Sequence, residues 1–176
     1  MNGNRTIGRV EAIHIALEAE GEMVAVPEAT AIAGVGIEKD RYAKSAGTFS
    51  SWPKDHEFTL IEAEAIEAMN TLPGISLATG ASRRNVTTRG VSLNGWIDKE
   101  FTIGEVRCRG TRLCQPCAHL QKLLGIEELV KIMHDRGGLR AVIIGGGTIR
   151  VGDMIAIESS VQEEIEKRNS ASRQSS

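Results

Sequence analysis

Two cysteines three residues apart carry the strongest chemical signal in this chain. Cys114 and Cys117 flank Pro116 in the stretch Arg112-Leu113-Cys114-Gln115-Pro116-Cys117-Ala118-His119-Leu120. The spacing fits four uses: half of a zinc site, a redox pair of the thioredoxin type, a single nucleophilic or metal-binding thiolate, or two small side chains that fill apolar gaps.

These uses differ in what they require elsewhere in the chain. A zinc site needs two more ligands, for which Cys108, His119 and His134 are candidates, and the sequence has no second CxxC or HxxxH pair. A thioredoxin-like pair needs a βαβ setting, which the pattern does not show. A helix that begins near Cys117 would favour a thiolate there through its unpaired backbone N–H groups. We therefore favour Cys117 as the catalytic or metal-binding thiolate and do not expect zinc.

A basic cluster gives the second signal. The stretch 82–90 holds the candidate cofactor-binding residues Arg83, Arg84, Asn85, Thr87 and Arg89. Alternation in a strand would send Arg83, Asn85, Thr87 and Arg89 to one face. Guanidinium groups and hydroxyls on one face can hold a phosphate or another oxyanion. Because no acidic residue occurs between Ala68 and Asp98, we favour an anion site over a solvated strand face.

Two smaller groups could extend this anion site. Arg136 and Arg140 flank two glycines where a helix is expected to return to a strand, with Gly137 as the left-handed end of that helix. A helix cap without further function explains this group nearly as well. Asp40 and Arg41 begin a polar loop over 39–56 and could line the same cleft or form a local ion pair.

The elements that must position these residues are short and mostly extended. Strands are expected at 5–17, 23–26, 29–37, 58–61, 101–112, 139–144 and 154–157. Helices are expected at 62–70 and, as two short helices or one kinked helix, at 121–135. Asn94-Gly95 and the glycines at 145–147 predict turns, and the latter lack the GxxxxGKS pattern of a nucleotide-binding loop. The pattern favours a β-rich α+β fold, with a bent, barrel-like mixed or antiparallel sheet and peripheral helices.

Composition limits the class of protein. The length of 176 residues, with 41% hydrophobic and 25% charged residues, is typical of one globular domain, which we expect over 1–158, followed by a polar tail at 159–176 that is a frayed helix or disordered. A net charge of −2 and the lack of a long apolar run argue against nucleic-acid and membrane partners. The polar N-terminus and the odd number of cysteines favour reduced thiols and a cytoplasmic location.

Taken in order, these stretches resemble the MOSC domain family, the module at the C-terminus of molybdenum cofactor sulfurases. The resemblance spans about Ile7 to Ile157 and is that of a small, stand-alone bacterial-type member. The stretches that carry it are Lys39-Asp40-Arg41-Tyr42, Leu60-Ile61-Glu62, Arg83 to Val91, Phe101-Thr102-Ile103-Gly104, Pro116-Cys117 with Leu120, Arg136 to Ala141, and Gly152-Asp153.

The resemblance implies a strongly bent, barrel-like sheet and a role around the molybdenum cofactor, a pterin whose dithiolene binds the metal and whose side chain ends in phosphate. The family's invariant cysteine corresponds to Cys117. In larger relatives, such as the mitochondrial amidoxime-reducing component, that cysteine is similar in role to a metal ligand, whereas sulfur transfer through a persulfide has been proposed for small members. The implied partners are a molybdoenzyme or a cysteine desulfurase, and neither haem nor a nucleotide is expected.

Two departures from larger relatives matter. The chain has no domain with a pyridoxal-phosphate lysine, so the family's association with pyridoxal phosphate does not imply that it desulfurates cysteine itself. Cys114 adds a second thiol, which leaves open a disulfide or a persulfide-resolving step. Three hypotheses follow: a sulfur transferase or molybdenum-dependent oxidoreductase component, a non-catalytic module that holds the cofactor for a partner enzyme, and a zinc-stabilised structural domain.

Overall fold

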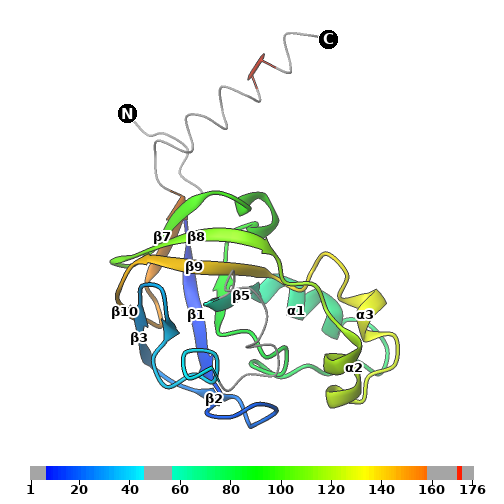
Figure 1. Ribbon diagram of the computed structural model, residues 1–176. Helices are drawn as coiled ribbons and strands as arrows, with labels where there is room; N and C mark the ends of the chain where they lie inside the picture. The colour runs from blue at the N-terminus through cyan, green and yellow to red at the C-terminus, as the bar shows by residue number, and fades with distance from the viewer. Residues whose placement is uncertain (1–6, 46–56, 158–169, 172–176) are drawn as a thin grey trace.

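The computed structural model describes residues 7–45, 57–157 and 170–171, and within these residues a closed 7-strand mixed barrel forms the centre (Figure 1). Neighbouring barrel strands are antiparallel, except that β5 and β6 run parallel. Around the barrel the order is β1 (Ile7–Ile15), β11 (Met154–Ile157), β7 (Glu100–Ile103), β8 (Val106–Leu113), β9 (Leu139–Gly145), β5 (Phe58–Glu62) and β6 (Val86–Arg89), which pairs with β1 again.

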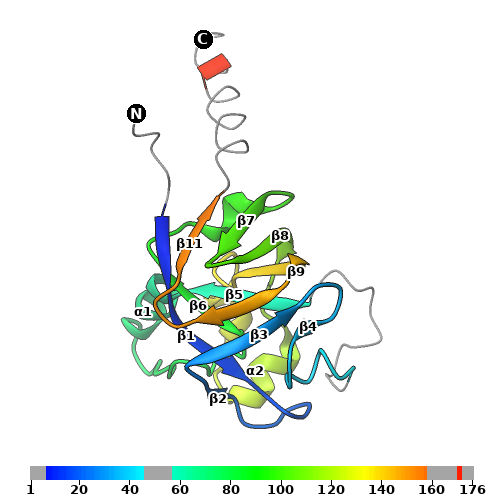
Figure 2. The same ribbon diagram turned by 90° about the vertical axis from the view of Figure 1, so that its left-hand side faces the viewer.

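A small sheet and the helices lie on opposite sides of this barrel (Figure 1). The small sheet consists of β10 (Gly147–Arg150), β3 (Glu28–Ile32) and β4 (Gly36–Ile37), and Figure 2 shows β3 crossing in front of the barrel. The remaining elements are β2 (Val24–Ala25), α1 (Ala63–Asn70), η1 (Leu93–Trp96), α2 (Ala118–Leu124) and α3 (Leu129–Ile132). No helix in the described ranges is long and apolar enough to cross a bilayer.

Two apolar clusters hold these layers together. The barrel interior is filled mainly by aliphatic side chains at alternate strand positions, and the rings of Trp96 and Phe101 pack 5.1 Å apart within it. The second cluster lies between the barrel wall and the helices and consists of Ile61, Ile66, Met69, Leu77, Leu120, Leu129 and Met133. Cys117 packs against this second cluster, so the helices position it relative to β5.

The predicted fold class is confirmed, and several elements differ in detail. The expected strand at 101–112 is the hairpin of β7 and β8, because the chain turns at Gly104, which has φ 55°. Likewise 29–37 divides into β3 and β4, Asn94-Gly95 lies within η1, and β10 was not anticipated. The two short helices over 121–135 are confirmed, with Gly125 ending α2 in the left-handed conformation. The loop interpretation beyond residue 45 and nearly all of the predicted tail lie outside the described residues.

Closure of the barrel depends on β11, whose buried side chains lie in register between β1 and β7. Ile155→Ala should lower the free energy of unfolding by about 2–5 kcal/mol, because it leaves a cavity at a fully buried position. The adjacent residue supplies the matched control: Met154 is 55% exposed, and Met154→Ala should change stability by less than about 0.5 kcal/mol. Urea unfolding of both variants checks this, and equal losses would contradict the assigned register.

Candidate functional site

The guanidinium of Arg84 joins three chain segments beside the helices. Its Nε donates to the carbonyl of Gly137 at 2.7 Å, Nη1 to that of Ser82 at 3.0 Å, and Nη2 to that of Cys114 at 2.9 Å. The residue is only 8% exposed and pairs with no carboxylate among the described residues. One buried cation therefore holds together three segments of the chain: 82–84, 114–117 and 136–138.

Two glycines allow this convergence. A Cβ on Gly137 would overlap the carbonyl oxygen of Cys114, and a Cβ on Gly138 would overlap that of Leu60. Gly138 also has φ 100°, whereas the left-handed residue at the end of the preceding turn is Asp135, with φ 58°. The expectation that Gly137 adopts the left-handed conformation is therefore wrong; it is glycine because another chain segment lies against it.

Cys117 is the N-cap residue of α2, so a helix does begin near this cysteine as the sequence suggested. Its side chain is half-buried. Its side chain makes no capping hydrogen bond, and its carbonyl accepts a hydrogen bond from the backbone N–H of Gln121 at 3.1 Å. All three cysteines are free thiols, with Cys114 and Cys108 buried. Burial, reinforced by the nearby Glu57 carboxylate, raises the pKa of the Cys108 thiol far above its ordinary value. Of the three sulfurs, that of Cys117 is the one accessible to a ligand.

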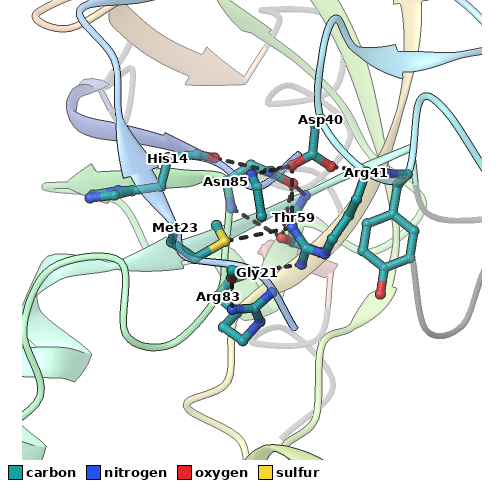
Figure 3. Close-up of polar contacts among 10 residues, drawn as sticks. His14, Gly21, Met23, Asp40, Arg41, Thr59, Arg83 and Asn85 are labelled. Carbon is teal, nitrogen blue, oxygen red and sulfur yellow. Dashed lines mark hydrogen bonds and ion pairs between the residues drawn. The ribbon is translucent and has the colours of Figure 1, made fainter. Parts of the chain in front are cut away.

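The carboxylate of Asp40 anchors a second convergence of loops, shown in Figure 3. Asp40 is 1% exposed, and its oxygens accept hydrogen bonds from the backbone N–H groups of Ala16 and Tyr42, from Arg41 Nη1 at 3.2 Å and from Asn85 Nδ2 at 3.2 Å. This arrangement is the ion pair that the sequence suggested for Asp40 and Arg41, but it is buried and involves strands far apart in the chain.

Asn85 links this network to the barrel. Its Oδ1 accepts hydrogen bonds from the backbone N–H and the hydroxyl of Thr59, and its Nδ2 donates to the carbonyl of His14 at 3.1 Å (Figure 3). Because these contacts satisfy the amide group on both sides, Asn85 holds β5 and β1 in place and has no capacity left for a ligand.

Arg83 lies differently, at the wall of a pocket. It has φ 63°, and its Nη1 donates to the carbonyl of Gly21 at 2.7 Å, while its Nη2 is buried without a hydrogen-bond partner. Burial, and secondarily the charge of Arg41, lowers the pKa of Arg83. The carboxylates of Asp40 and Glu20 partly offset the charges of these two guanidinium groups. An anion beside Arg83 would accept a hydrogen bond from the orphaned donor.

The pocket has a volume of about 280 Å³ and lies between the loop that precedes β6 and the C-terminal end of α2. It is lined by Glu20, Gly21, Glu22, Met23, Ala78, Thr79, Gly80, Ala81, Arg83, Leu123 and Leu124. Ala81 and Leu124 of the pocket, and separately Cys117, pack against the same apolar cluster between the barrel and the helices. His119, two residues after Cys117, contacts Glu20 at 3.2 Å and connects α2 to the opposite wall.

Sequence reasoning missed the wall formed by 20–23 and two buried polar groups near Arg83. The sequence of 20–23 carries no local pattern that marks a site. The His14 ring packs against Gly80, and its Nδ1 has no hydrogen-bond partner; neither does the buried Oγ of Ser82. His14 is 4% exposed, so its ring belongs to the packed interior.

The expectation that Arg83, Asn85, Thr87 and Arg89 share one strand face is wrong. β6 begins only at Val86, Thr87 is 3% exposed, and Arg83 lies in a turn before the strand. Arg89 Nε donates to Glu11 at 2.6 Å, and its Nη2 donates to Glu67. These contacts raise the pKa of Arg89 and neutralise its charge, so it is not placed as a free anion ligand.

Two other predicted residues, Arg136 and Arg140, do not line the pocket. Arg136 is exposed on the turn before β9, and Arg140 lies on β9 in register with Arg112 of β8. For the zinc alternative, no group of three or more His, Cys, Asp or Glu side chains within the described ranges could hold a metal ion. His134, one of the candidate ligands, instead contacts Asp135 at 3.3 Å.

Burial lowers the pKa of His14 from its ordinary value of 6.5, because the charged ring would lose its hydration. The unfolded chain therefore binds a proton at a higher pH than the folded protein does, and stability should fall as the pH drops from about 7 to about 5. Urea unfolding across this range should show a steeper loss for the wild type than for His14→Gln. Parallel pH profiles would contradict this assignment.

Comparisons with known proteins agree with the observed barrel. The MOSC domain model matches residues 43–156. The structure is similar to that of YuaD from Bacillus subtilis, with a TM-score of 0.74 and 15% identity over 88% of this chain and 97% of that one. It is also similar to YiiM from Escherichia coli, with a TM-score of 0.60 and 17% identity over 86% and 70% of the two chains. For YiiM from Geobacillus stearothermophilus the TM-score is 0.66, with 13% identity over 86% and 75%.

At such low identity these structures establish the fold alone, and no curated protein matches the sequence. The family assignment rests on the domain match, which covers most of the chain and includes β5 to β10, Cys117 and all of the converging segments around Arg84. The chain therefore belongs to the MOSC domain family.

Proposed function

We propose that this protein binds the molybdenum cofactor, with the anionic end of the ligand at Arg83 and the Cys117 thiolate presented to its metal-bearing end. The observation that carries the proposal is the buried Nη2 of Arg83, which has no hydrogen-bond partner and belongs to a residue that lines the pocket. Cys117 caps the start of α2, whose last residue, Leu124, lines that pocket, and both residues pack against the same apolar cluster.

The residues present fit such a ligand chemically. A phosphate accepts charge-assisted hydrogen bonds from guanidinium groups, and the second guanidinium, of Arg41, adds to the local positive charge. The cofactor, when bound, supplies a pterin dithiolene that carries molybdenum, a metal that suits a thiolate ligand. The apolar side chains of Met23, Leu123 and Leu124 offer a surface for the less polar part of the ligand.

Three other predicted site residues do not line the pocket but hold the backbone segments around it. Arg84 fixes the backbone of Cys114, at the start of the Cys114–Cys117 stretch, and that of Gly137. Asp40 and Asn85 fix the loop that carries Arg83. We therefore assign Arg84, Asp40 and Asn85 as positioning residues and Arg83 as the residue that touches the ligand.

Sulfur carriage is the second candidate function, because the Cys117 thiol is free and the least buried of the three cysteines. Within the described ranges Cys117 is not grouped with other metal-binding side chains, an arrangement that suits a carrier as well as a single ligand. The Cys117 thiolate would attack the outer sulfur of a donor persulfide. A new S–S bond forms at Cys117, the donor S–S bond breaks, and the donor leaves as a thiolate. A cysteine desulfurase would be the donor, and a molybdoenzyme the destination.

The first test examines the protein after expression in a host that makes the cofactor and anaerobic purification. Elemental analysis, pterin fluorescence and intact mass should reveal bound molybdenum and pterin, or one extra sulfur atom on the chain. Cys117→Ala should abolish the extra sulfur or sharply lower the molybdenum content, because both uses require this thiolate. Cys114→Ala is the control and should retain either signal. Absence of all three signals from the wild type would overturn the proposal.

The second test compares the contributions of Arg83 and Arg89 to cofactor binding. Arg83→Ala should lower the pterin content of anaerobically purified protein by about tenfold or more, because a charge-assisted hydrogen bond contributes about 1.5–3 kcal/mol. Arg89→Ala should leave the pterin content within about twofold of the wild type, because its charge is already paired with carboxylates. Equal losses in both variants would contradict the assignment of Arg83 as the ligand-binding arginine.

A further inference from the structure

Four arginines project from the outside of the barrel on two neighbouring strands. On β8, Val106, Cys108 and Gly110 are buried while Arg107 and Arg109 are exposed. An irregularity in the pairing between Gly110 and Arg112 brings Arg112 opposite Arg140 of β9, with both side chains outside the barrel. We call Arg107, Arg109, Arg112 and Arg140 the arginine face.

The charges of this face are incompletely neutralised by the protein itself. Arg107 pairs with Glu100 at 3.3 Å, but the guanidinium groups of Arg109 and Arg140 have no hydrogen-bond or ion-pair partner among the described residues. Two guanidinium groups on neighbouring strands, those of Arg109 and Arg140, are therefore left to pair with an external anion.

The shape of the face indicates an extended acidic partner. Arg107 to Arg112 span roughly 16 Å along β8, with alternate residues about 7 Å apart, which is also the repeat of alternate side chains in an extended peptide. Such a strip is too long for one phosphate or one small carboxylate to satisfy.

The composition of the face favours protein over nucleic acid. Val142, in register with Arg109, and Ile144, 36% exposed, lie among the arginines, and arginine around apolar contacts is typical of protein interfaces. Trp96, Phe58 and Phe101 are buried in the barrel, so within the described ranges the face offers no aromatic platform for bases.

We propose that the arginine face is a docking surface for an acidic segment of a partner protein. The face ends at Arg112, two residues before Cys114, so a docked partner would lie beside the segment that carries Cys117. Docking depends on the charges of β8 and β9 and not on what the thiol does, so it stands independently of cofactor binding or sulfur carriage.

Fluorescence anisotropy with a labelled oligoglutamate peptide tests this proposal on the full chain. The wild type should bind the peptide at low salt, with affinity that falls as salt is added. The double variant Arg109→Glu/Arg140→Glu should bind at least about tenfold more weakly, because two attractive charges become repulsive. Cys117→Ala should bind like the wild type, which separates docking from the chemistry of the thiol.

The matched control reverses the same number of charges elsewhere. Arg150 on β10 and Lys131 on α3 are exposed and lie on other elements, so Arg150→Glu/Lys131→Glu gives the same net charge while leaving the face intact. Its affinity should stay within about twofold of the wild type. Equal weakening in both double variants, tighter binding to an oligothymidylate of equal charge than to the peptide, or no binding at all would overturn the proposal. Circular dichroism should show that both variants keep the barrel.

Discussion

The buried guanidinium of Arg84 is the interaction on which the site depends. Its three carbonyl hydrogen bonds join three segments that adjoin barrel strands, namely 82–84 before β6, 114–117 after β8 and 136–138 before β9. A charge removed from water is tolerated only when its donors are satisfied, and backbone carbonyls do this here without a carboxylate. The same contacts fix the chain before Cys117, so the position of its sulfur follows from that of a buried cation.

The arginines around the site differ in role because different groups surround each guanidinium. Arg84 is satisfied by carbonyls, Arg41 by the buried Asp40, and Arg89 by carboxylates of β1 and α1. Arg83 alone in the stretch 83–89 combines a buried, unpartnered nitrogen with a pocket. The residue type is the same in each case, and the neighbours that the fold supplies decide whether an arginine supports the structure, stabilises the surface or remains available to an anion.

Much of the fold follows from local patterns. Alternation of apolar residues predicts most of the strands, because one side of each strand faces the barrel interior, and the Ala- and Glu-rich stretch 62–70 predicts α1. The hairpin at Gly104 and the short η1 were not predictable in this way, since a single glycine fits either a bend or a complete turn. The ordered motifs also identify the family without any knowledge of which side chains meet.

At the candidate site, the sequence determines the residue types, and the tertiary structure determines which of them meet. The sequence by itself determined the accessible type of chemistry: a cysteine after proline at a helix start, and arginines in a stretch without acids. It could not determine that Glu11, Glu64 and Glu67 would neutralise Arg89, because these carboxylates come from other strands and helices. Nor could it show that Gly137 is required by the approach of Cys114, or that 20–23 forms a wall of the pocket. Electrostatic and steric contacts act across a few ångströms of space, whatever the separation along the chain, so only the folded structure decided which of these residues remained free to act.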